Sequence, residues 1–514
     1  MNSNNNLRFR RQFLFTNTDI KPENDWKRVK LSLLQMDLNL IHHSDLEYTY
    51  SKKTLTVIAL GFILDPFHPG YSNQDIVNYL ANKKILEEVL HQSDYYTGRY
   101  VLIVSDKTNI YVFNDAIGLR QVFYYFKNKK FWIGSSPNII ACYTTCARTE
   151  SNALLEYLNS DYFKNSNSSW FGNETPYKNL YLLQPNFHLD LLQKKTTRFW
   201  PNNHLEKKNL KEFIPFVSKI LIGAILSAHK RYELQLALTG GWDSRVILSA
   251  SRHITKDIEF YTVKEKENFK RNIYDFTIPQ KLADKFNLNY FLIELDHKEP
   301  NHEFMKIFKG NSIFNRNVYT RHYSKFIELG FNKKLDITGV VGDQILKAHY
   351  RLNGDMSAEN IAYKYNLQNY KYVVNSIKNW LKETEEIREN HEIHLIDWFN
   401  WEHYCPNWAG LSSTEHDISH EDFKIFNCRE LLTSFVLMND NLRYRDYPIL
   451  HKRIVHYNWK ELLKVQVESS NIHYRNLKKI LRFLQLEMYI EKVYKTFQYY
   501  KRKLSSHRCL TKKE

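Results

Sequence analysis

Cysteine is scarce in this chain of 514 residues, which has only five: Cys142, Cys146, Cys405, Cys428 and Cys509. The number is odd and the positions are widely spread, so no disulfide framework is indicated. Cys142 and Cys146 lie close together, but no second pair completes a zinc-binding set. We therefore interpret all five as reduced structural residues.

Long hydrophobic runs are also absent. The longest, around residues 54–64, is typical of a strand and too short to cross a membrane. The N-terminus is rich in Asn and then basic, without the apolar core of a secretory signal, so we expect a cytoplasmic location. Hydrophobic residues make up 43% of the chain, as in globular proteins, and its length predicts two or more domains.

Positive charge is plentiful, with a formal net charge of +17. It is densest in residues 471–514, which hold 12 Lys and Arg against 3 Asp and Glu. Two interpretations of this basic tail stay open. It is either a solvated amphipathic helix with a frayed end, or a docking surface for a nucleic acid, an anionic membrane or an acidic partner.

The spacing of apolar residues divides the chain into two kinds of structure. Short β-rich runs occupy residues 55–63, 100–105, 110–114, 122–125 and 131–134, and helical spacing occupies residues 73–91. From about Lys208, helices and strands alternate, which is typical of a parallel sheet with crossover helices. The helices are expected at 210–231, 244–253 and 275–286, and the strands at 234–238, 258–263, 290–294 and 334–338. Pro201 and its neighbours predict a linker near residues 200–208.

The most informative segment is residues 236–248, Leu-Ala-Leu-Thr-Gly-Gly-Trp-Asp-Ser-Arg-Val-Ile-Leu. A strand that delivers a glycine turn to a helix N-terminus presents backbone N–H groups at the positive end of the helix dipole. Gly240 and Gly241 leave room for phosphate oxygens, while Thr239 and Ser244 add hydroxyl donors. Asp243 does not favour a bare phosphate, so we expect it to hold Mg²⁺. The alternative is a glycine turn before a buried helix.

This segment lacks the Lys that closes a GxxxxGK[ST] loop. It resembles instead the pyrophosphate-binding loop of the ATP-pyrophosphatase superfamily, [ST]-G-G-x-D-S, and matches it at every specified position. Enzymes of that superfamily cleave ATP between the α and β phosphates and leave AMP on the substrate.

The first half of the chain resembles the class II glutamine amidotransferase domain. The segments that carry this resemblance are 98–104, 114–120, 124–125 and 134–136, with 180–185 and 198–200 resembling the closing segment of that domain. Together with the pyrophosphate loop, most of residues 50–465 resemble glutamine-dependent asparagine synthetase and its relatives, the β-lactam synthetases and lasso-peptide cyclases.

The resemblance implies an α/β protein with three parts. Residues 1–205 would form a degenerate N-terminal Ntn-type αββα amidotransferase-like domain. Residues 206–470 would form a doubly wound parallel-sheet ATP-pyrophosphatase domain, of the adenine nucleotide α-hydrolase-like type, and residues 471–514 a basic helical tail.

The chain departs from the glutamine-hydrolysing members at its N-terminus. Their mature chains begin with Cys, whose thiol attacks the glutamine amide with help from its own α-amine. Here Asn2 follows Met1, and no cysteine precedes Cys142. The Asn-Gly and Gly-Asp-x-Asp elements that hold glutamine are not apparent either. We therefore expect no glutamine chemistry and an amine already present on the substrate, as in β-lactam synthetases and lasso cyclases.

A second departure lies in residues 336–344, where the family has Ser-Gly-Glu-Gly-x-Asp-Glu. Thr338, Gly339 and Asp343 match, and the resemblance implies that Asp343 joins Asp243 in holding Mg²⁺. The first Glu, second Gly and last Glu of the family are replaced by Val340, Val341 and Gln344. Loss of the first Glu argues against an aspartate-specific site, and a surface acid or helix cap is the alternative for Asp343.

The acceptor side of the reaction is less sharply indicated. The resemblance implies a Glu that steers or deprotonates the amine, and Glu402 is the candidate because burial among Trp398, Trp401, Tyr404 and Trp408 would raise the pKa of its carboxyl. We expect Pro406 to break this helix. A buried ion pair with Arg429 or Arg443 stays open for Glu402. The resemblance also implies a pyrophosphate-neutralising cation, for which the candidates are Arg443, Lys452, Arg445 and Arg453.

By resemblance, the chain is an ATP-dependent, AMP-forming amide ligase. The implied ATP-binding residues are Leu238, Thr239, Gly240, Gly241, Asp243, Ser244, Val263, Thr338 and Gly339. We expect a small-molecule or peptide carboxylate and an amine as substrates, no nucleic acid, and a homodimer as one option. The alternative is a degenerate ATP-binding scaffold or accessory factor in peptide or surface-polysaccharide biosynthesis. RNA modification is disfavoured because no cysteine lies near the loop for sulfur transfer.

Overall fold

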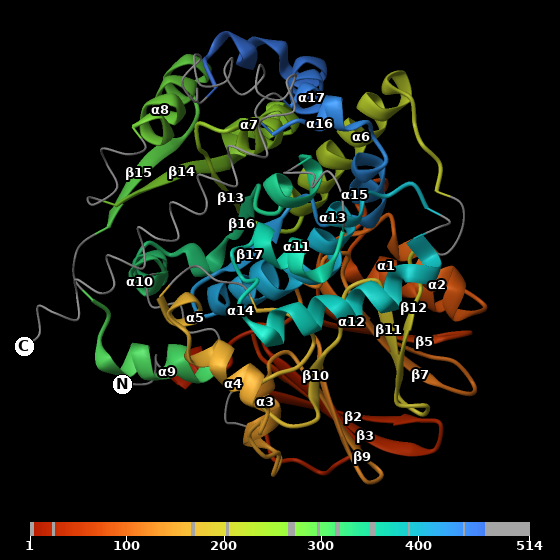
Figure 1. The fold of residues 1–514 in the computed structure, drawn as a ribbon. Coiled ribbons are helices and arrows are strands. Elements are labelled where there is room, and N and C mark those ends of the chain that lie inside the picture. The colour runs from red at the N-terminus through yellow and green to blue at the C-terminus, as the bar shows by residue number, and fades with distance from the viewer. Residues whose placement is uncertain are drawn as a thin grey trace, which may run out of the picture. The chain divides into compact units, whose positions relative to one another are not determined.

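The computed structural model describes residues 5–22, 26–165, 170–201, 205–265, 273–295, 299–313, 319–348, 356–388, 391–445 and 448–467. The stretch Met1–Val465 forms one compact unit (Figure 1). The predicted basic tail at 471–514 lies outside the described residues. No helix in the described ranges is long and apolar enough to cross a membrane.

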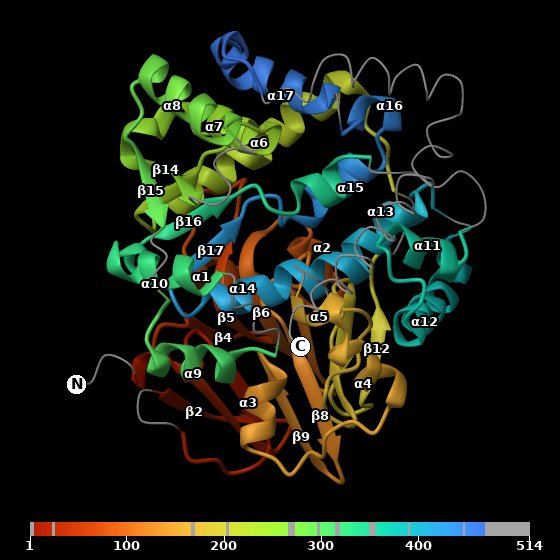
Figure 2. The same ribbon diagram turned by 60° about the vertical axis from the view of Figure 1, so that its left-hand side comes forward.

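Two six-stranded antiparallel sheets form the N-terminal part. The first runs β10 (Leu180–Leu182), β8 (Phe123–Lys127), β9 (Lys130–Gly134), β1 (Phe13–Thr16), β3 (Met36–His43), β2 (Trp26–Leu33). The second runs β12 (Lys195–Arg198), β11 (Phe187–Asp190), β7 (Ile110–Asn114), β6 (Thr97–Ser105), β5 (Thr56–Leu64), β4 (Tyr48–Lys52). Strands β5 to β9 occur where β-rich runs were predicted, within a few residues, whereas no run was predicted at β1 to β4, β11 or β12. Figure 2 displays both sheets.

The two antiparallel sheets pack face to face, and helices cover their outer faces. Phe15 and Leu40 of the first sheet share a core with Ile58 and Val101 of the second. Helices α1 (Asn73–Ala81) and α2 (Leu86–Ser93) pack on the other face of the second sheet, and α3 (Pro137–Cys142) packs on the first. Because both faces are covered, every residue of β5 and β6 is buried. The predicted αββα arrangement is confirmed, and the helical spacing predicted at 73–91 corresponds to two helices, α1 and α2.

A five-stranded parallel sheet follows, in the order β15 (Tyr290–Leu295), β14 (Ile258–Glu265), β13 (Leu234–Ala237), β16 (Leu335–Thr338), β17 (Glu421–Lys424). Helix α6 (Leu210–His229) precedes this sheet, and its crossover helices include α7 (Trp242–Ala250), α8 (Tyr274–Phe286), α9 (His302–Asn311) and α10 (Thr320–Glu328). The strand order reverses between β13 and β16. In such a sheet the loops that follow the two strands at the reversal diverge and open a crevice. The predicted doubly wound parallel sheet is confirmed.

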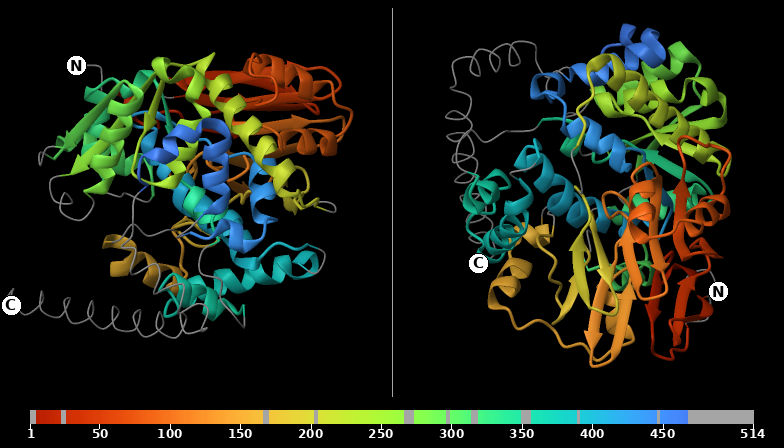
Figure 3. Two further views of the ribbon diagram at one scale, coloured as in Figure 1. Left: turned by 90° about the horizontal axis from the view of Figure 1, so that it is seen from above. Right: turned by 90° about the vertical axis from the view of Figure 1, so that its right-hand side faces the viewer.

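The rest of the described chain is mainly helical: α4 (Asn152–Asn159) and α5 (Asp161–Asn165) before the parallel sheet, and α11 (Ala358–Lys364), α12 (Lys371–Arg388), α15 (Arg429–Val436), α16 (Asp440–Arg443) and α17 (Ile449–Trp459) after β16. Helix α17 contacts α7 (Figure 3). A continuous helical run joins α13 (Leu395–Phe399) to α14 (Leu411–His416) through two π-helical segments.

Pro406 does not break this helical run, contrary to prediction. It begins the second π-helical segment, Pro406–Gly410, and the residue before it keeps right-handed helical dihedral angles. An α-helix has no place for a proline ring beside the preceding turn, whereas the wider π turns accommodate it.

Buried ion pairs join the antiparallel sheets to the parallel sheet. The Arg99 guanidinium donates two hydrogen bonds, of 2.6 and 2.7 Å, to the Asp417 carboxylate, and both side chains are at most 3% exposed. Arg120 and Arg11 pair with Glu421 at the start of β17. Buried charges are tolerated only when they are paired with good geometry. The folding of the two parts is therefore coupled through this junction.

We expect Arg99→Ala to lower the free energy of unfolding by about 3–5 kcal/mol, because the Asp417 carboxylate would stay buried without its partner. The control is Lys178→Ala, whose ion pair with Glu150 is solvent-exposed and is worth no more than about 1 kcal/mol. Urea unfolding followed by circular dichroism compares the two variants. Equal stability losses would contradict a special role for the junction.

Candidate functional site

The loop between β13 and α7 is closed by its own hydroxyl groups. The Ser244 Oγ donates to the Thr239 carbonyl at 3.0 Å and accepts from the Thr239 N–H at 3.2 Å. The Gly241 N–H donates to the Thr239 Oγ1 at 3.3 Å. Gly241 is the N-cap of α7 and receives no side-chain capping bond. The hydroxyls expected to face a ligand are thus bonded within the turn, and the helix N-terminus is left without a side-chain cap.

The two glycines of this loop have different roles. A Cβ at Gly240 would lie 2.9 Å from the Tyr274 carbonyl oxygen, so glycine is needed here for packing against α8. A Cβ at Gly241 would meet only the Thr239 hydroxyl, at 3.5 Å. The room predicted for phosphate therefore lies at Gly241, whereas the space beside Gly240 is taken by α8.

The loop after β16 packs directly on Asp243. A Cβ at Gly339 would lie 2.9 Å from the Asp243 Cβ, and one at Gly342 would lie 2.9 Å from the Asp243 Oδ1. Val341 between them has φ +75°, a left-handed conformation that is strained for a β-branched residue. The two loops at the strand reversal thus meet at one carboxylate.

A buried lysine bridges the two acids that were predicted to hold the metal. The Lys347 Nζ lies 2.7 Å from the Asp243 Oδ2 and 3.1 Å from the Asp343 Oδ1, and its side chain is 7% exposed. Burial alone would raise the pKa of Asp243, but Lys347 and His451 outweigh it and the pKa is lowered. Burial alone would lower the pKa of Lys347, and the two carboxylates outweigh it and raise the pKa. Asp243 and Lys347 are therefore both charged at neutral pH.

Two further basic side chains complete this cluster. The His451 Nε2 lies 3.1 Å from the Asp243 Oδ1, and burial holds the pKa of this histidine below its ordinary value. The neutral ring therefore donates to Asp243, while its buried Nδ1 has no hydrogen-bond partner among the described residues. Arg445 pairs with the Asp343 Oδ2 at 3.2 Å. We name Asp243, Asp343, Lys347, Arg445 and His451 the acid–base cluster.

The structure brings most of the predicted phosphate-loop residues together, but not the predicted cations Arg443 and Lys452. Arg443 is fully buried, donates to the Ile345 and Leu346 carbonyls, and pairs with Asp397 at 2.7 Å. Its role is therefore to hold the backbone of the segment that follows β16. Lys452 and Arg453 are exposed on α17. Among the four candidate cations, only Arg445 pairs with one of the two acids within the described ranges.

Glu402 is completely buried in an ion pair. Its Oε1 pairs with Arg198 and accepts from the Asn186 Nδ2 at 2.9 Å, and its Oε2 accepts from the Trp380 Nε1 at 3.1 Å. The Asn186 Oδ1 in turn accepts from Arg429 at 2.9 Å. The partner of Glu402 is thus Arg198 of the antiparallel part. The alternative interpretation was correct in expecting a buried ion pair, but its partner is neither Arg429 nor Arg443. The role as amine base stays a prediction.

The predicted adenine contacts Leu238 and Val263 lie on the parallel sheet. The Leu238 side chain is buried, and its N–H donates to the Tyr261 carbonyl at 2.8 Å. The Leu238 carbonyl accepts from the Thr262 hydroxyl. Val263 in β14 packs beside Tyr261 and Ile293. Both backbone polar groups of Leu238 are therefore already used within the protein.

Sequence reasoning missed Lys347 and His451. Lys347 follows Asp343 by four residues, a spacing that favours an ion pair on a helical turn and gave a usable signal. His451 is separated from Asp243 by 208 residues, and only the packing of α17 on α7 joins them.

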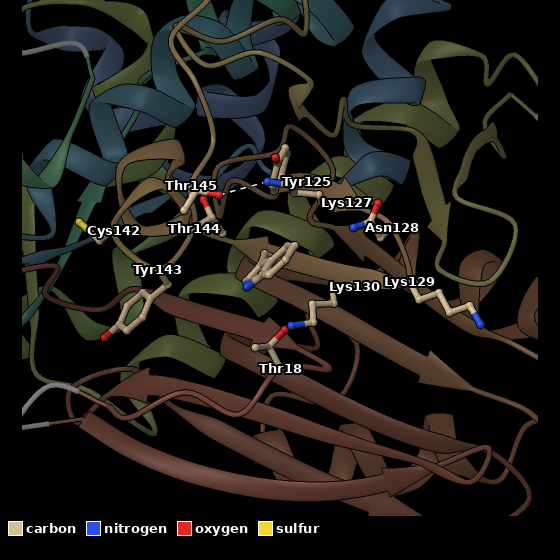
Figure 4. Close-up of a pocket in the computed structure, with 11 residues that line it drawn as sticks. Thr18, Tyr125, Lys127, Asn128, Lys129, Lys130, Cys142, Tyr143, Thr144 and Thr145 are labelled. Atoms are coloured by element: carbon tan, nitrogen blue, oxygen red, sulfur yellow. Dashed lines mark hydrogen bonds between the residues drawn. The ribbon is translucent and has the colours of Figure 1, made fainter.

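A cavity of about 830 Å³ lies apart from the acid–base cluster, on the antiparallel part (Figure 4). The β8–β9 hairpin and the segment after α3 contribute most of its lining: Tyr125, Lys127, Asn128, Lys129, Lys130, Trp132, Cys142, Tyr143, Thr144 and Thr145. No predicted site residue lines it. Two of the lining residues are bonded to each other, since the Lys127 Nζ donates to the Thr145 hydroxyl at 3.1 Å.

We expect Gly339→Ala to lower the free energy of unfolding by about 1–3 kcal/mol, since the new methyl group would collide with Asp243. Gly241→Ala is the matched control, expected within about 0.5 kcal/mol of the unmodified chain because its Cβ would meet only the Thr239 hydroxyl, at an ordinary contact distance of 3.5 Å. Urea unfolding measures both. A Gly339→Ala chain as stable as the Gly241→Ala chain would contradict the close approach of the two loops.

Comparison with known proteins gives only remote similarities. No family model matches the chain, and no curated protein matches it. Among solved structures, glutamine phosphoribosylpyrophosphate amidotransferase from B. subtilis, complexed with ADP and GMP, is 9% identical with a TM-score of 0.21, over 56% of this chain and 61% of that chain. NMN synthetase from Francisella tularensis is 11% identical with a TM-score of 0.20, over 41% of this chain and 97% of that one. At these scores, function has to be argued from the site.

Proposed function

We propose that this chain is an ATP-dependent carbon–nitrogen ligase that forms AMP and pyrophosphate and has no glutaminase activity of its own. The observation that carries the proposal is the position of the Thr239–Ser244 loop. It lies at the strand reversal of a doubly wound sheet, at the N-terminus of a nine-residue helix, beside Lys347. Ligands of such sheets bind at this crevice, and helix N-termini favour phosphates.

The proposed reaction has two steps. An oxygen of the substrate carboxylate attacks the α-phosphorus of ATP, the bond between the α-phosphorus and the bridging oxygen breaks, and pyrophosphate leaves. An amine then attacks the acyl carbon, AMP leaves, and the amine proton passes to a base, for which Glu402 stays the sequence-based candidate. Positive charge near the leaving pyrophosphate stabilises the transition state of the first step. Lys347 and Arg445 are the cations of the cluster suited to this role.

The start of the first strand supports the proposed lack of glutaminase activity. Glutamine hydrolysis in the resembling family needs a thiol and a free α-amine on one residue. Before β1, Arg11 donates to the Asp417 carbonyl at 2.9 Å, and Gln12 donates to the Asn311 carbonyl at 3.2 Å. The chain therefore enters β1 through the bonded residues Arg11 and Gln12, and none of residues 5–12 is a cysteine.

The second candidate function is an ATP-binding scaffold or accessory factor. It is favoured by the strained Val341 and by the bridged acids, both of which differ from what a metal-dependent family site would require. The two functions separate experimentally, because a scaffold binds ATP without exchanging pyrophosphate. The ligase proposal also includes three further features. They are a division into domains at about residue 205, small-molecule or peptide substrates, and a homodimer.

We expect Asp243→Asn to reduce ATP–pyrophosphate exchange about 100-fold or more. The reason is that the transition state would lose several kcal/mol of electrostatic stabilisation around the leaving group. Exchange is measured with mixtures of amino acids and dicarboxylic acids, and ATP binding is measured in parallel by calorimetry. Asp284→Asn, an exposed acid on α8, is the control. Exchange that survives Asp243→Asn unchanged would contradict the role of the loop.

We also expect the purified chain to release no glutamate from glutamine, since the thiol and α-amine pair is missing. The assay follows glutamate by enzyme-coupled detection, with and without ATP. A glutaminase activity that co-purifies with the chain through successive columns would overturn this expectation.

A further inference from the structure

The acid pair at the strand reversal already contains a cation. The Lys347 Nζ lies within 3.1 Å of an oxygen of each carboxylate. We infer that Lys347 is the resident cation of this site, taking the place between Asp243 and Asp343 that the resembling family gives to Mg²⁺. The chain would then bind no divalent ion on this pair. The inference rests on the proposed function, because it concerns how the same loop binds phosphate.

The geometry leaves no room for both cations. Mg²⁺ binds oxygen at about 2.0–2.1 Å in near-octahedral geometry, so it enters between these carboxylates only if the ammonium leaves. Lys347 cannot simply turn into solvent, because its side chain is 7% exposed. The next residue is also fixed, since the Ala348 N–H donates to the Arg443 carbonyl at 2.9 Å.

While Lys347 and Arg445 are in place, the charge of the cluster does not attract a divalent ion. Val340 and Gln344 stand where the resembling family has carboxylates, and Val340 offers no side-chain oxygen. The described part of the chain contains no group of three His, Cys, Asp or Glu side chains arranged to hold a metal. Among the described residues, two cations, Lys347 and Arg445, already pair with two carboxylates. Little excess negative charge is left to attract Mg²⁺ or Mn²⁺.

A lysine supplies what a phosphate needs in a different way from a metal. The ammonium has three N–H donors. Two are directed at Asp243 and Asp343, at 2.7 and 3.1 Å. The third remains for a phosphate oxygen bound at the adjacent N-terminus of α7. The carboxylates then hold the ammonium in place, and His451 fixes the other oxygen of Asp243. Phosphate binding by this loop would therefore not require a divalent ion bridging the two acids.

The first experiment titrates Mn²⁺ into the full chain without nucleotide and follows free Mn²⁺ by electron paramagnetic resonance. We expect that no Mn²⁺ site of the unmodified chain depends on Asp243. Asp243→Asn should therefore leave the Mn²⁺ titration unchanged. Lys347→Gln is expected to create one such site, and Lys347→Gln with Asp343→Asn to abolish it. Lys281→Gln, an exposed lysine on α8, is the matched control and should create none. Thermal unfolding checks that each variant folds.

Two results of this titration would overturn the inference, and the first needs no variant of Lys347. If the unmodified chain binds one Mn²⁺ and Asp243→Asn or Asp343→Asn removes it, the metal and not the lysine belongs between the acids. If Lys347→Gln folds and gains no site, the two acids do not hold a metal even without the lysine. This result would also contradict the inference that Lys347 takes the place of a metal ion.

The second experiment compares the binding of ATP by calorimetry with excess Mg²⁺ and with EDTA. We expect the two dissociation constants of the unmodified chain to agree within about tenfold, a difference of 1.4 kcal/mol. Lys347→Gln should weaken binding in EDTA by more than tenfold. If ATP binds only with Mg²⁺, and Lys347→Gln is without effect, the inference fails while the proposed function stands. If ATP binds under neither condition, the proposed function fails, and the Mn²⁺ titration still decides the place of Lys347.

Discussion

The contact on which the site depends is the ion pair between the Lys347 ammonium and the Asp243 carboxylate. Asp243 stands in the first turn of α7 and is held between two loops that follow the neighbouring strands β13 and β16 but come from distant parts of the sequence. An unpaired carboxylate in this position would be costly, since buried charges need partners. Lys347 supplies the opposite charge, and the glycines at 339 and 342 allow the loop that carries it to come close enough.

The antiparallel part of the chain has a physical role whether or not it performs chemistry. Its arginines neutralise Asp417 and Glu421 beside β17, and Arg198 neutralises Glu402 in the helical region. The backbone at Pro66 lies so close to α6 that a Cβ at Gly223 would overlap its carbonyl oxygen. A part with this many buried partners cannot be lost without exposing unpaired charges on the parallel-sheet part. The parallel-sheet part therefore depends on this part for its buried ion pairs, even in a chain proposed to lack glutaminase activity.

Much of the fold was predictable because its signals are local. Alternating and periodic apolar residues located β5 to β9 and β13 to β16 within a few residues, and the glycine turn located the start of α7. Other features depend on tertiary packing. The two helices at 73–93 have similar apolar spacing on either side of their break, and Pro406 is accommodated by π-helical turns that no sequence pattern indicated.

The same distinction holds for the site. The loop residues Thr239, Asp243 and Ser244 were found because they lie together in one short motif, and Asp343 because it matches the family segment that follows a strand. His451 was not found, since its contact with Asp243 exists only through the packing of α17 on α7. Arg443 was one of the cations implied by the family resemblance, and Glu402 was identified as an acid among aromatic residues, a pattern shared by catalytic residues and buried ion pairs. Their partners, Asp397 and Arg198, lie 46 and 204 residues away in the sequence and could not be paired with them from it.

The most direct test of this account is a crystal structure of the chain with the ATP analogue α,β-methylene-ATP, grown in EDTA. The account predicts phosphate density at the N-terminus of α7 beside Gly241, with the Lys347 Nζ still bridging Asp243 and Asp343. Density for the analogue at another place in the chain, or a displaced Lys347 side chain pointing away from both acids, would contradict it.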